Sequence, residues 1–379
     1  MPNSVDVVVV GGGPAGAVMA LALGRGGAKV RLLEGRAEPA WKVGETLAPG
    51  GRSALQGLGI WEKFRRGGHL PSHGNRSCWG GESLLEKDFI FNREGCGWQL
   101  DRRQFEALLL QEAAAMGAEV RMGVSLTRIR RTGAGWTVET SDGICHADLL
   151  VDASGRSAVI ARALGVKRLA SDRLVSLYAV ATATSESDRD TRLLLETLPD
   201  GWFYSALTPG GKRTVAYQTD ADLLAGSEWR DPSWFRRQLG KTRHLAALLE
   251  AHGHGFESAP RLTSAHSGRL ERWGGEGWFA VGDAAMSFDP LSGQGILQAM
   301  QSAHSTAAVL LDVGASSREA LWRWNEQVWE AYLKSRQDYY AMERRWLTQP
   351  FWQRRLFAEP LTREGTRSVE LIPGAGRVS

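Results

Sequence analysis

Three glycines with fixed spacing lie between an apolar run and an alanine- and leucine-rich segment near the start of the chain. They are Gly11, Gly13 and Gly16, and the run before them is Val5–Val10. The first glycine permits a tight turn, the second lets the backbone approach a pyrophosphate, and the third lets a helix pack closely on a strand. The N-terminus of that helix offers amide groups and the positive end of its dipole to phosphate. This spacing predicts a dinucleotide-binding site.

An acidic residue follows at the distance that such a site requires. Glu34 ends the next expected strand, Lys29–Leu33, about 20 residues beyond the glycines. Its carboxylate can accept hydrogen bonds from ribose hydroxyls. The glycines alone would also fit a turn that binds nothing, but the strand, helix and acid together favour a dinucleotide.

A second motif follows the buried-type strand Trp278–Gly282. Asp283 stands at the end of that strand, and Gly293-Gln294-Gly295 opens an alanine-rich helix. The carboxylate can bind a ribityl hydroxyl, and the helix N-terminus can stabilise negative charge on a flat ring. From these residues alone, Asp283 is equally well explained as the cap of an ordinary strand–turn–helix.

A third motif, Asp-Ala-Ser-Gly-Arg-Ser at 152–157, follows the expected strand Asp148–Val151. In this order, the three motifs resemble those of the FAD-dependent monooxygenases of the para-hydroxybenzoate hydroxylase class, over roughly residues 5–312. The resemblance implies an α/β fold. It consists of a FAD-binding Rossmann-type domain, similar to that of glutathione reductase, with an inserted antiparallel β-sheet substrate domain and a helical C-terminus.

Three further stretches, at 42–47, 69–79 and 97–102, resemble the halogenase-like branch of this class. Within that branch the chain is most similar to the flavoprotein maturases of cysteine tryptophylquinone enzymes, of the lysine and glycine oxidase type, and Gly201–Ala206 continues this similarity. In that family the flavoprotein is implicated in oxygenating a tryptophan of a partner protein.

The tryptophan halogenases differ from this chain at two places. Their Trp-x-Trp-x-Ile-Pro segment corresponds to Trp202–Pro209, which lacks the second Trp and the Ile-Pro. Their catalytic lysine has no match, because Lys87 is the only lysine between Lys63 and Lys167 and its flanking residues differ. Halogenation is therefore disfavoured.

Arg102, at the start of an expected helix, matches the flavin-binding arginine of the family. Its guanidinium can pair with phosphate or cover the edge of the ring, although the residue type alone would also fit a helix surface. The resemblance and the motifs together predict the following FAD-binding residues: Gly11, Gly13, Ala15, Gly16, Glu34, Gly35, Arg36, Lys42, Glu45, Thr46, Arg102, Asp283, Pro290, Gly293, Gln294 and Gly295.

The implied reaction is hydroxylation of an electron-rich, indole-type ring through a flavin C4a-hydroperoxide formed with O2. The substrate would be an aromatic small molecule or a tryptophan of a partner protein. A second Gly-x-Gly-x-x-Gly is absent, so NAD(P)H would reduce the FAD by transient binding or through a separate flavin reductase. Candidate catalytic residues are His69, His73 and Pro290, with His266 as a further histidine. Imidazoles titrate near neutral pH, although each histidine is also explained by a structural role.

Three alternatives stay open beside hydroxylation. They are flavin-dependent halogenation, reduction of prenyl chains as in the geranylgeranyl reductases that share the flavin fold, and a non-catalytic role as a flavin-containing assembly factor. Anaerobic turnover of a polyprenyl substrate would favour the reductase.

Apolar and polar residues alternate from Leu174 to Thr219, which indicates an antiparallel insertion between the second and third motifs. After Ser316 the chain is helical in pattern and rich in Trp, Tyr and Arg, which suits either a helical cap packed on the FAD domain or a docking surface or pocket lid. The predicted domains are 1–75, 98–168 and 268–315 for FAD, 76–97 and 169–267 for the substrate, and 316–379 for a C-terminal helical segment.

Composition sets the broader limits. The 379 residues carry 46 Lys and Arg against 42 Asp and Glu, a surplus too small to indicate nucleic acid or a membrane surface. The three cysteines have no Cys-x-x-Cys spacing, so we expect a reducing cytoplasm. No apolar run reaches the roughly 18 residues of a membrane span, and we expect no signal peptide. No metal-ligand spacing occurs. The 15 tryptophans fit a Trp-rich core or an aromatic pocket.

Overall fold

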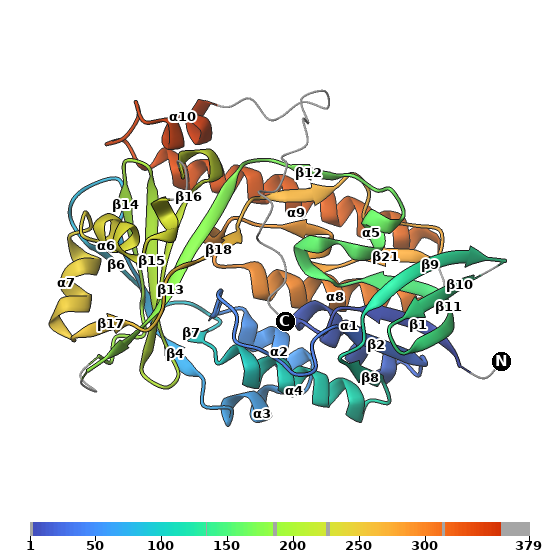
Figure 1. The fold of residues 1–379 in the computed structure, drawn as a ribbon. Helices are drawn as coiled ribbons and strands as arrows, with labels where there is room; N and C mark the ends of the chain where they lie inside the picture. Colours follow the sequence, from blue (N-terminus) through green and yellow to red (C-terminus); the bar gives the residue numbers. More distant parts are fainter. Residues whose placement is uncertain (1–2, 134, 185–187, 225–227, 313–314, 358–379) are drawn as a thin grey trace. The chain divides into compact units, whose positions relative to one another are not determined.

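The computed structural model describes residues 3–133, 135–184, 188–224, 228–312 and 315–357. The chain forms two compact units, each assembled from three separate stretches of sequence (Figure 1). The first unit contains the chain up to Gly68, Asp101–Leu169 and Gly268–Tyr332, and the second contains His69–Leu100, Ala170–Ser267 and the chain from Leu333 onward.

This division differs from the predicted domains at their edges. Residues 69–75 and 98–100 belong to the second unit, because β4 (Leu70–Ser72) pairs with β7 (Gly97–Gln99) and the two strands stay together. The C-terminal segment is shared between the units, since residues up to Tyr332 belong to the first. Its end, residues 358–379, lies outside the described residues.

A mixed sheet with a parallel centre forms the first unit. The valine run of β1 (Ser4–Val10) lies between two parallel neighbours, β2 (Val30–Glu34) and β11 (Gly143–Asp152), and Val7–Val10 are buried as predicted for a strand covered on both faces. In spatial order the strands are β20 (Gly274–Gly275), β21 (Trp278–Ala280), β11 (Gly143–Asp152), β1 (Ser4–Val10), β2 (Val30–Glu34) and β8 (Glu119–Met122), with β10 (Gly135–Thr140) and β9 (Leu126–Thr132) continuing from β11.

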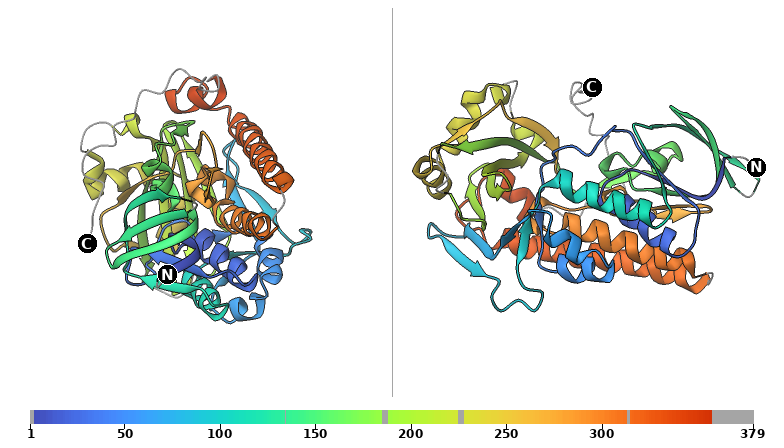
Figure 2. Two further views of the ribbon diagram at one scale, coloured as in Figure 1. Left: turned by 90° about the vertical axis from the view of Figure 1, so that its right-hand side faces the viewer. Right: turned by 90° about the horizontal axis from the view of Figure 1, so that it is seen from below.

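Helix α1 packs on β1 and β2 and lies between α4 and α8 (Figure 2). The helices of this unit are α1 (Pro14–Arg25), α2 (Gly51–Gly57), α3 (Trp61–Arg65), α4 (Arg102–Ala115), α5 (Val159–Ala163), α8 (Gly295–Leu311) and α9 (Ala315–Ala341) up to Tyr332. Three short strands, β3 (Thr46–Leu47), β19 (Gly268–Leu270) and β22 (Met286–Ser287), complete it, and β12 (Arg168–Ala170) contains the point where the chain passes into the second unit.

The second unit is built on the predicted inserted sheet, which is antiparallel except where β14 pairs with β5 in parallel. In spatial order its strands are β17 (His254–Phe256), β13 (Leu174–Ala183), β16 (Lys212–Asp220), β15 (Gly201–Thr208), β14 (Leu193–Leu198), β5 (Gly74–Cys78) and β6 (Leu85–Asp88), and β18 (Arg261–Ser264) also pairs with β13. The helices are α6 (Pro232–Leu239), α7 (His244–Ala251) and α10 (Pro350–Phe357).

Alternation along β15 sends neighbouring side chains to opposite faces of this sheet. Phe203 packs with Tyr217 and with Phe235 of α6. On the other face Trp202 belongs to a cluster of aromatic rings contributed largely by the end of the chain. We call this the aromatic cluster, and it consists of Trp79, Trp202, Tyr340, Phe351 and Trp352.

Buried ion pairs fix the C-terminal residues in the same unit. Arg355 Nη2 lies 2.8 Å from Asp220 Oδ1, and Arg336 Nη2 lies 2.9 Å from Asp172 Oδ2. Burial alone would raise the pKa of Glu343, but hydrogen bonds from Arg345 and other donors outweigh it and hold this pKa below its usual value. Tyr340, Glu343, Phe351, Trp352 and Arg355 are buried and therefore form part of the core of the second unit.

Candidate functional site

The glycines of the turn between β1 and α1 have two different roles: Gly11 and Gly16 are needed for packing, whereas Gly13 leaves room for a ligand. Gly11 has a φ of +112°, and a Cβ there would lie 2.3 Å from the Ala153 carbonyl oxygen. A Cβ on Gly16 would lie 1.8 Å from the Gly11 carbonyl oxygen. Both positions need glycine for the fold itself. A Cβ on Gly13, in contrast, would meet no atom within 4 Å in the described chain, so its glycine leaves open space.

The N-terminus of α1 faces that space. Gly13 is the N-cap, Pro14 is the first helical residue, and no side chain of the described residues caps the helix. Ala15, in the first turn, packs against the second motif, because a Cβ on Gly282 would lie 2.8 Å from the Ala15 Cβ. The structure thus brings the first and second motifs together.

Glu34 is held beside the glycine turn. Its Oε2 accepts a hydrogen bond from the Gly12 amide at 2.7 Å, and its Oε1 accepts one from the Arg36 amide at 3.0 Å. Each carboxylate oxygen keeps a further lone pair for another donor. Gly35 and Arg36 follow β2 and are exposed.

Asp152, the first residue of the third motif, has a structural role. Its side chain is fully buried and accepts hydrogen bonds from the Ser154 amide at 3.1 Å and the Ala161 amide at 2.9 Å. These bonds hold the turn that presses the Ala153 carbonyl against Gly11.

Arg156, in the same motif, reaches the second motif. Its Nη2 donates to the Phe288 carbonyl at 3.1 Å, and its Nε lies 3.5 Å from Asp283 Oδ2. Arg168 joins it by donating to Ser287 Oγ at 2.6 Å. Burial, together with the charge of Arg156, lowers the pKa of Arg168 to about 10. Neither arginine was among the site residues predicted from the sequence.

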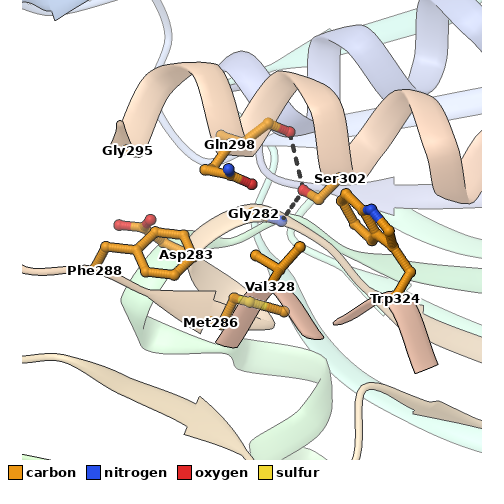
Figure 3. Close-up of a pocket in the computed structure, with 10 residues that line it drawn as sticks. Gly282, Asp283, Met286, Phe288, Gly295, Gln298, Ser302, Trp324 and Val328 are labelled. Atoms are coloured by element: carbon orange, nitrogen blue, oxygen red, sulfur yellow. Dashed lines mark hydrogen bonds between the residues drawn. The ribbon is translucent and has the colours of Figure 1, made fainter. Parts of the chain in front are cut away.

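Asp283 does not cap a helix. It lies within the short turn Gly282–Ala284, and the carboxylate contact made by Arg156 orients it. Figure 3 shows Asp283 and Gly295 on the rim of a pocket beneath α8, where the Gly282 amide donates to Ser302 Oγ at 2.9 Å. The remaining lining residues are Met286, Phe288, Gln298, Ala299, Ser302, Trp324 and Val328.

The loop before α8 presents its backbone to open space. Asp289 stabilises the turn Pro290–Ser292, since its Oδ1 accepts from the Leu291 amide at 2.9 Å. A Cβ on Gly293 or on Gly295 would meet no atom within 4 Å among the described residues. Gln294 is the N-cap of α8 and its side chain makes no capping hydrogen bond, while its own amide donates to Ser292 Oγ at 3.2 Å.

A charged cluster lies at the start of α4. Arg102 Nη1 donates to the Gly44 carbonyl at 2.7 Å, and its Nη2 pairs with Glu106. Lys42 Nζ lies 2.7 Å from Glu106 Oε2, so two cations share one carboxylate. Glu45, which follows Gly44 in the sequence, is buried, and Thr46 is the first residue of β3. The Arg102 Nε is buried and finds no hydrogen-bond partner in the described chain.

The candidate catalytic residues fall in both units. Pro290 belongs to the first unit, whereas His69, His73 and His266 belong to the second. His69 is buried before β4, His73 is exposed after it, and His266 Nδ1 lies 2.6 Å from Ser264 Oγ. His69 and His73 therefore do not share one environment.

The residues of the first unit fit a FAD molecule. The open spaces at Gly13, Gly293 and Gly295 allow close backbone approach, and the N-termini of α1 and α8 supply amide donors. The unpartnered Arg102 Nε suits a phosphate oxygen. The part of the chain that the structure describes contains no group of three or more acidic, His or Cys side chains suited to a metal ion. It also contains no helix with the length and apolar character needed to cross a membrane.

The chain belongs to the FAD-binding domain family, whose model matches residues 4–323. It is a FAD-dependent oxidoreductase. A protein of Marinomonas mediterranea described as the FAD-dependent oxidoreductase LodB is 31% identical over 368 residues, which cover 93% of this chain and 97% of LodB. A tryptophan 2-halogenase of Chondromyces crocatus is 26% identical over 320 residues, 81% of this chain and 61% of the halogenase.

Solved structures agree with this family. The peptidyl tryptophan dihydroxylase QhpG, essential for tryptophylquinone cofactor biogenesis, matches with a TM-score of 0.77 and 26% identity over 93% of this chain and 78% of QhpG. The myxobacterial chondrochloren halogenase CndH has a TM-score of 0.85 at 22% identity, covering 93% of this chain and 86% of CndH, and shows the fold alone.

Arg156→Met is expected to weaken FAD binding about tenfold, because it removes the cation that orients Asp283 and a donor to the Phe288 carbonyl. Arg162→Met, at an exposed position of α5, is the matched control and should leave the affinity unchanged. Titration of apoprotein with FAD, followed by flavin fluorescence, measures both. Equal affinities for the two variants would contradict a role of Arg156 in the site.

Proposed function

We propose that this flavoenzyme is a monooxygenase that hydroxylates an indole-type ring, and that the ring is a tryptophan side chain of a partner protein. The similarity to the peptidyl tryptophan dihydroxylase, over 93% of this chain, carries the proposal. The Trp202–Pro209 segment, which lacks the Trp-x-Trp-x-Ile-Pro pattern of the tryptophan halogenases, supports it.

Bound FAD supplies the transfer of one oxygen atom from O2 to the aromatic ring, and the protein contributes binding, orientation and electrostatics. The glycine turn, Glu34 and the Lys42–Arg102 cluster hold the ADP part. Asp283, which Arg156 orients, would accept a hydrogen bond from the ribityl chain.

The ring-facing residues belong to the loop before α8. Pro290 would pack beside the ring, and the amides at Gly295 would stabilise negative charge on it. Electrons come from NAD(P)H, by transient binding or through a separate flavin reductase.

Flavin-dependent halogenation is the second candidate function, favoured by the similarity to the tryptophan 2-halogenase. That chemistry depends on a lysine enclosed near the substrate. Lys87 lies on β6, an edge strand of the second unit whose four residues are all exposed. This position supports hydroxylation over halogenation.

The test supplies the reduced holoenzyme with isotope-labelled O2, in buffer containing chloride and bromide. The probes are free tryptophan, a short tryptophan-containing peptide, and the unmodified precursor of a tryptophylquinone enzyme. Mass spectrometry reads each product. We expect labelled oxygen on the tryptophan of the precursor, with less or none on free tryptophan.

Two results would overturn the proposal. A halogen on any probe would establish the second candidate function. Reoxidation of the FAD with no oxygen incorporated into any of the three probes would remove the assignment to tryptophan.

A further inference from the structure

Helix α9 lies outside the three motifs, yet one of its residues contacts the loop that the flavin site depends on. The Asp289 amide donates to the Tyr332 hydroxyl at 2.9 Å. The Tyr332 ring packs edge to face on Phe288, with 4.6 Å between ring centroids. Tyr332 therefore contacts two successive residues immediately before Pro290. All of these residues belong to the first unit.

The loop has bonds within itself and contacts from outside, and Arg156 contributes one of these outside contacts by donating to the Phe288 carbonyl at 3.1 Å. The Leu291 amide donates to Asp289 Oδ1, the Ser292 amide to the Asp289 carbonyl, and the Gly293 amide to the Pro290 carbonyl. These bonds fix the shape of the turn, while Tyr332 and Arg156 tie the residues before Pro290 to other elements of the unit. Asp289 is 1% exposed, so its amide, which donates the hydrogen bond to the Tyr332 hydroxyl, lies in the protein interior. An interior amide that loses its acceptor is costly.

We propose that Tyr332 is a positioning residue for bound FAD: its hydroxyl and ring together set where Pro290 and the N-terminus of α8 meet the flavin ring. The proposal rests on FAD occupying this site and not on the identity of the substrate. Two separate interactions make it testable, because phenylalanine keeps the ring contact with Phe288 and removes only the hydroxyl acceptor.

The position of α8 affects the cofactor through charge. Amides at a helix N-terminus stabilise negative charge within about the first turn. If the loop shifts, the reduced, anionic form of the flavin loses part of this stabilisation. Tyr332→Phe should therefore make the reduction potential of bound FAD more negative, alter its visible absorption spectrum, and weaken FAD binding about three- to tenfold.

Tyr339→Phe is the matched control. Tyr339 lies on the same helix and is 45% exposed, and it accepts a hydrogen bond from Trp79 Nε1 through its backbone carbonyl. This variant should keep the potential, spectrum and affinity of the wild type. Tyr332→Leu, which also removes the ring, should change all three quantities more than Tyr332→Phe.

The measurements are the absorption spectrum, the potential against reference dyes, and the FAD dissociation constant. A Tyr332→Phe protein with the wild-type potential and spectrum would overturn the proposal, whatever its thermal stability. Since no substrate is present, failure of the hydroxylation assay leaves this result intact, and a negative result here leaves the hydroxylation proposal intact.

Discussion

Gly13→Val is expected to abolish stable FAD binding and to leave the apoprotein as stable as the wild type. The Gly13 backbone has φ −73° and ψ −176°, an extended conformation that valine adopts readily. The new side chain would enter space that no described protein atom fills, where we place the pyrophosphate. We expect at least a hundredfold loss of affinity, about 2.7 kcal/mol.

Two comparison variants separate ligand exclusion from damage to the fold. Gly57→Val, at the exposed last residue of α2, also meets no described atom and should bind FAD normally. Gly16→Ala places a Cβ against the Gly11 carbonyl and should destabilise the apoprotein itself. Calorimetric titration with FAD and thermal denaturation of each apoprotein provide the readouts. Normal FAD affinity in Gly13→Val would show that the pyrophosphate does not pass over Gly13.

Trp352→Ala is expected to lower the free energy of unfolding of the second unit by about 3–5 kcal/mol. Trp352 is fully buried in the aromatic cluster, and its Nε1 donates to the Leu198 carbonyl at 3.0 Å. The substitution leaves a cavity and also removes a donor from a buried carbonyl.

Urea denaturation followed by tryptophan fluorescence measures this loss. Tyr339→Ala is the matched control, because Tyr339 is 45% exposed on the part of α9 that belongs to the second unit, and its removal should cost about 1 kcal/mol or less. A Trp352→Ala protein as stable as this control would mean that the C-terminal residues are not part of the core of the second unit.

Local motifs predicted the cofactor family because their causes are local. The steric demands at Gly11 and Gly16 arise within one strand–turn–helix, so spacing alone reveals them. The valine run of β1 similarly predicted a strand that is buried between parallel neighbours.

The missed site residues depend on distant partners. Arg156 and Ser287 are 131 residues apart in sequence, and Arg168 and Ser287 are 119 apart. No local spacing encodes these contacts. Even so, the sequence carried a signal for Arg156. A cation placed just after a buried strand needs an acceptor nearby, so its position in the third motif pointed to a polar partner.

The domain edges were harder to predict for a similar reason. The return of β4 to β7 and the division of α9 between the units both follow from long-range packing. Trp352 and Tyr340 suited a surface cap or a docking site in sequence, and only their burial beside Trp202 distinguishes a core role.

The three-stretch construction of the second unit has a consequence for biosynthesis. Its strands leave the ribosome long before Trp352 and Arg355, which complete the aromatic cluster and neutralise Asp220. Until then a face of the nascent sheet and a carboxylate lack their partners. This unit can reach its stable state only once α10 has been synthesised, so transcripts cut short before α10 should yield chains that proteases remove.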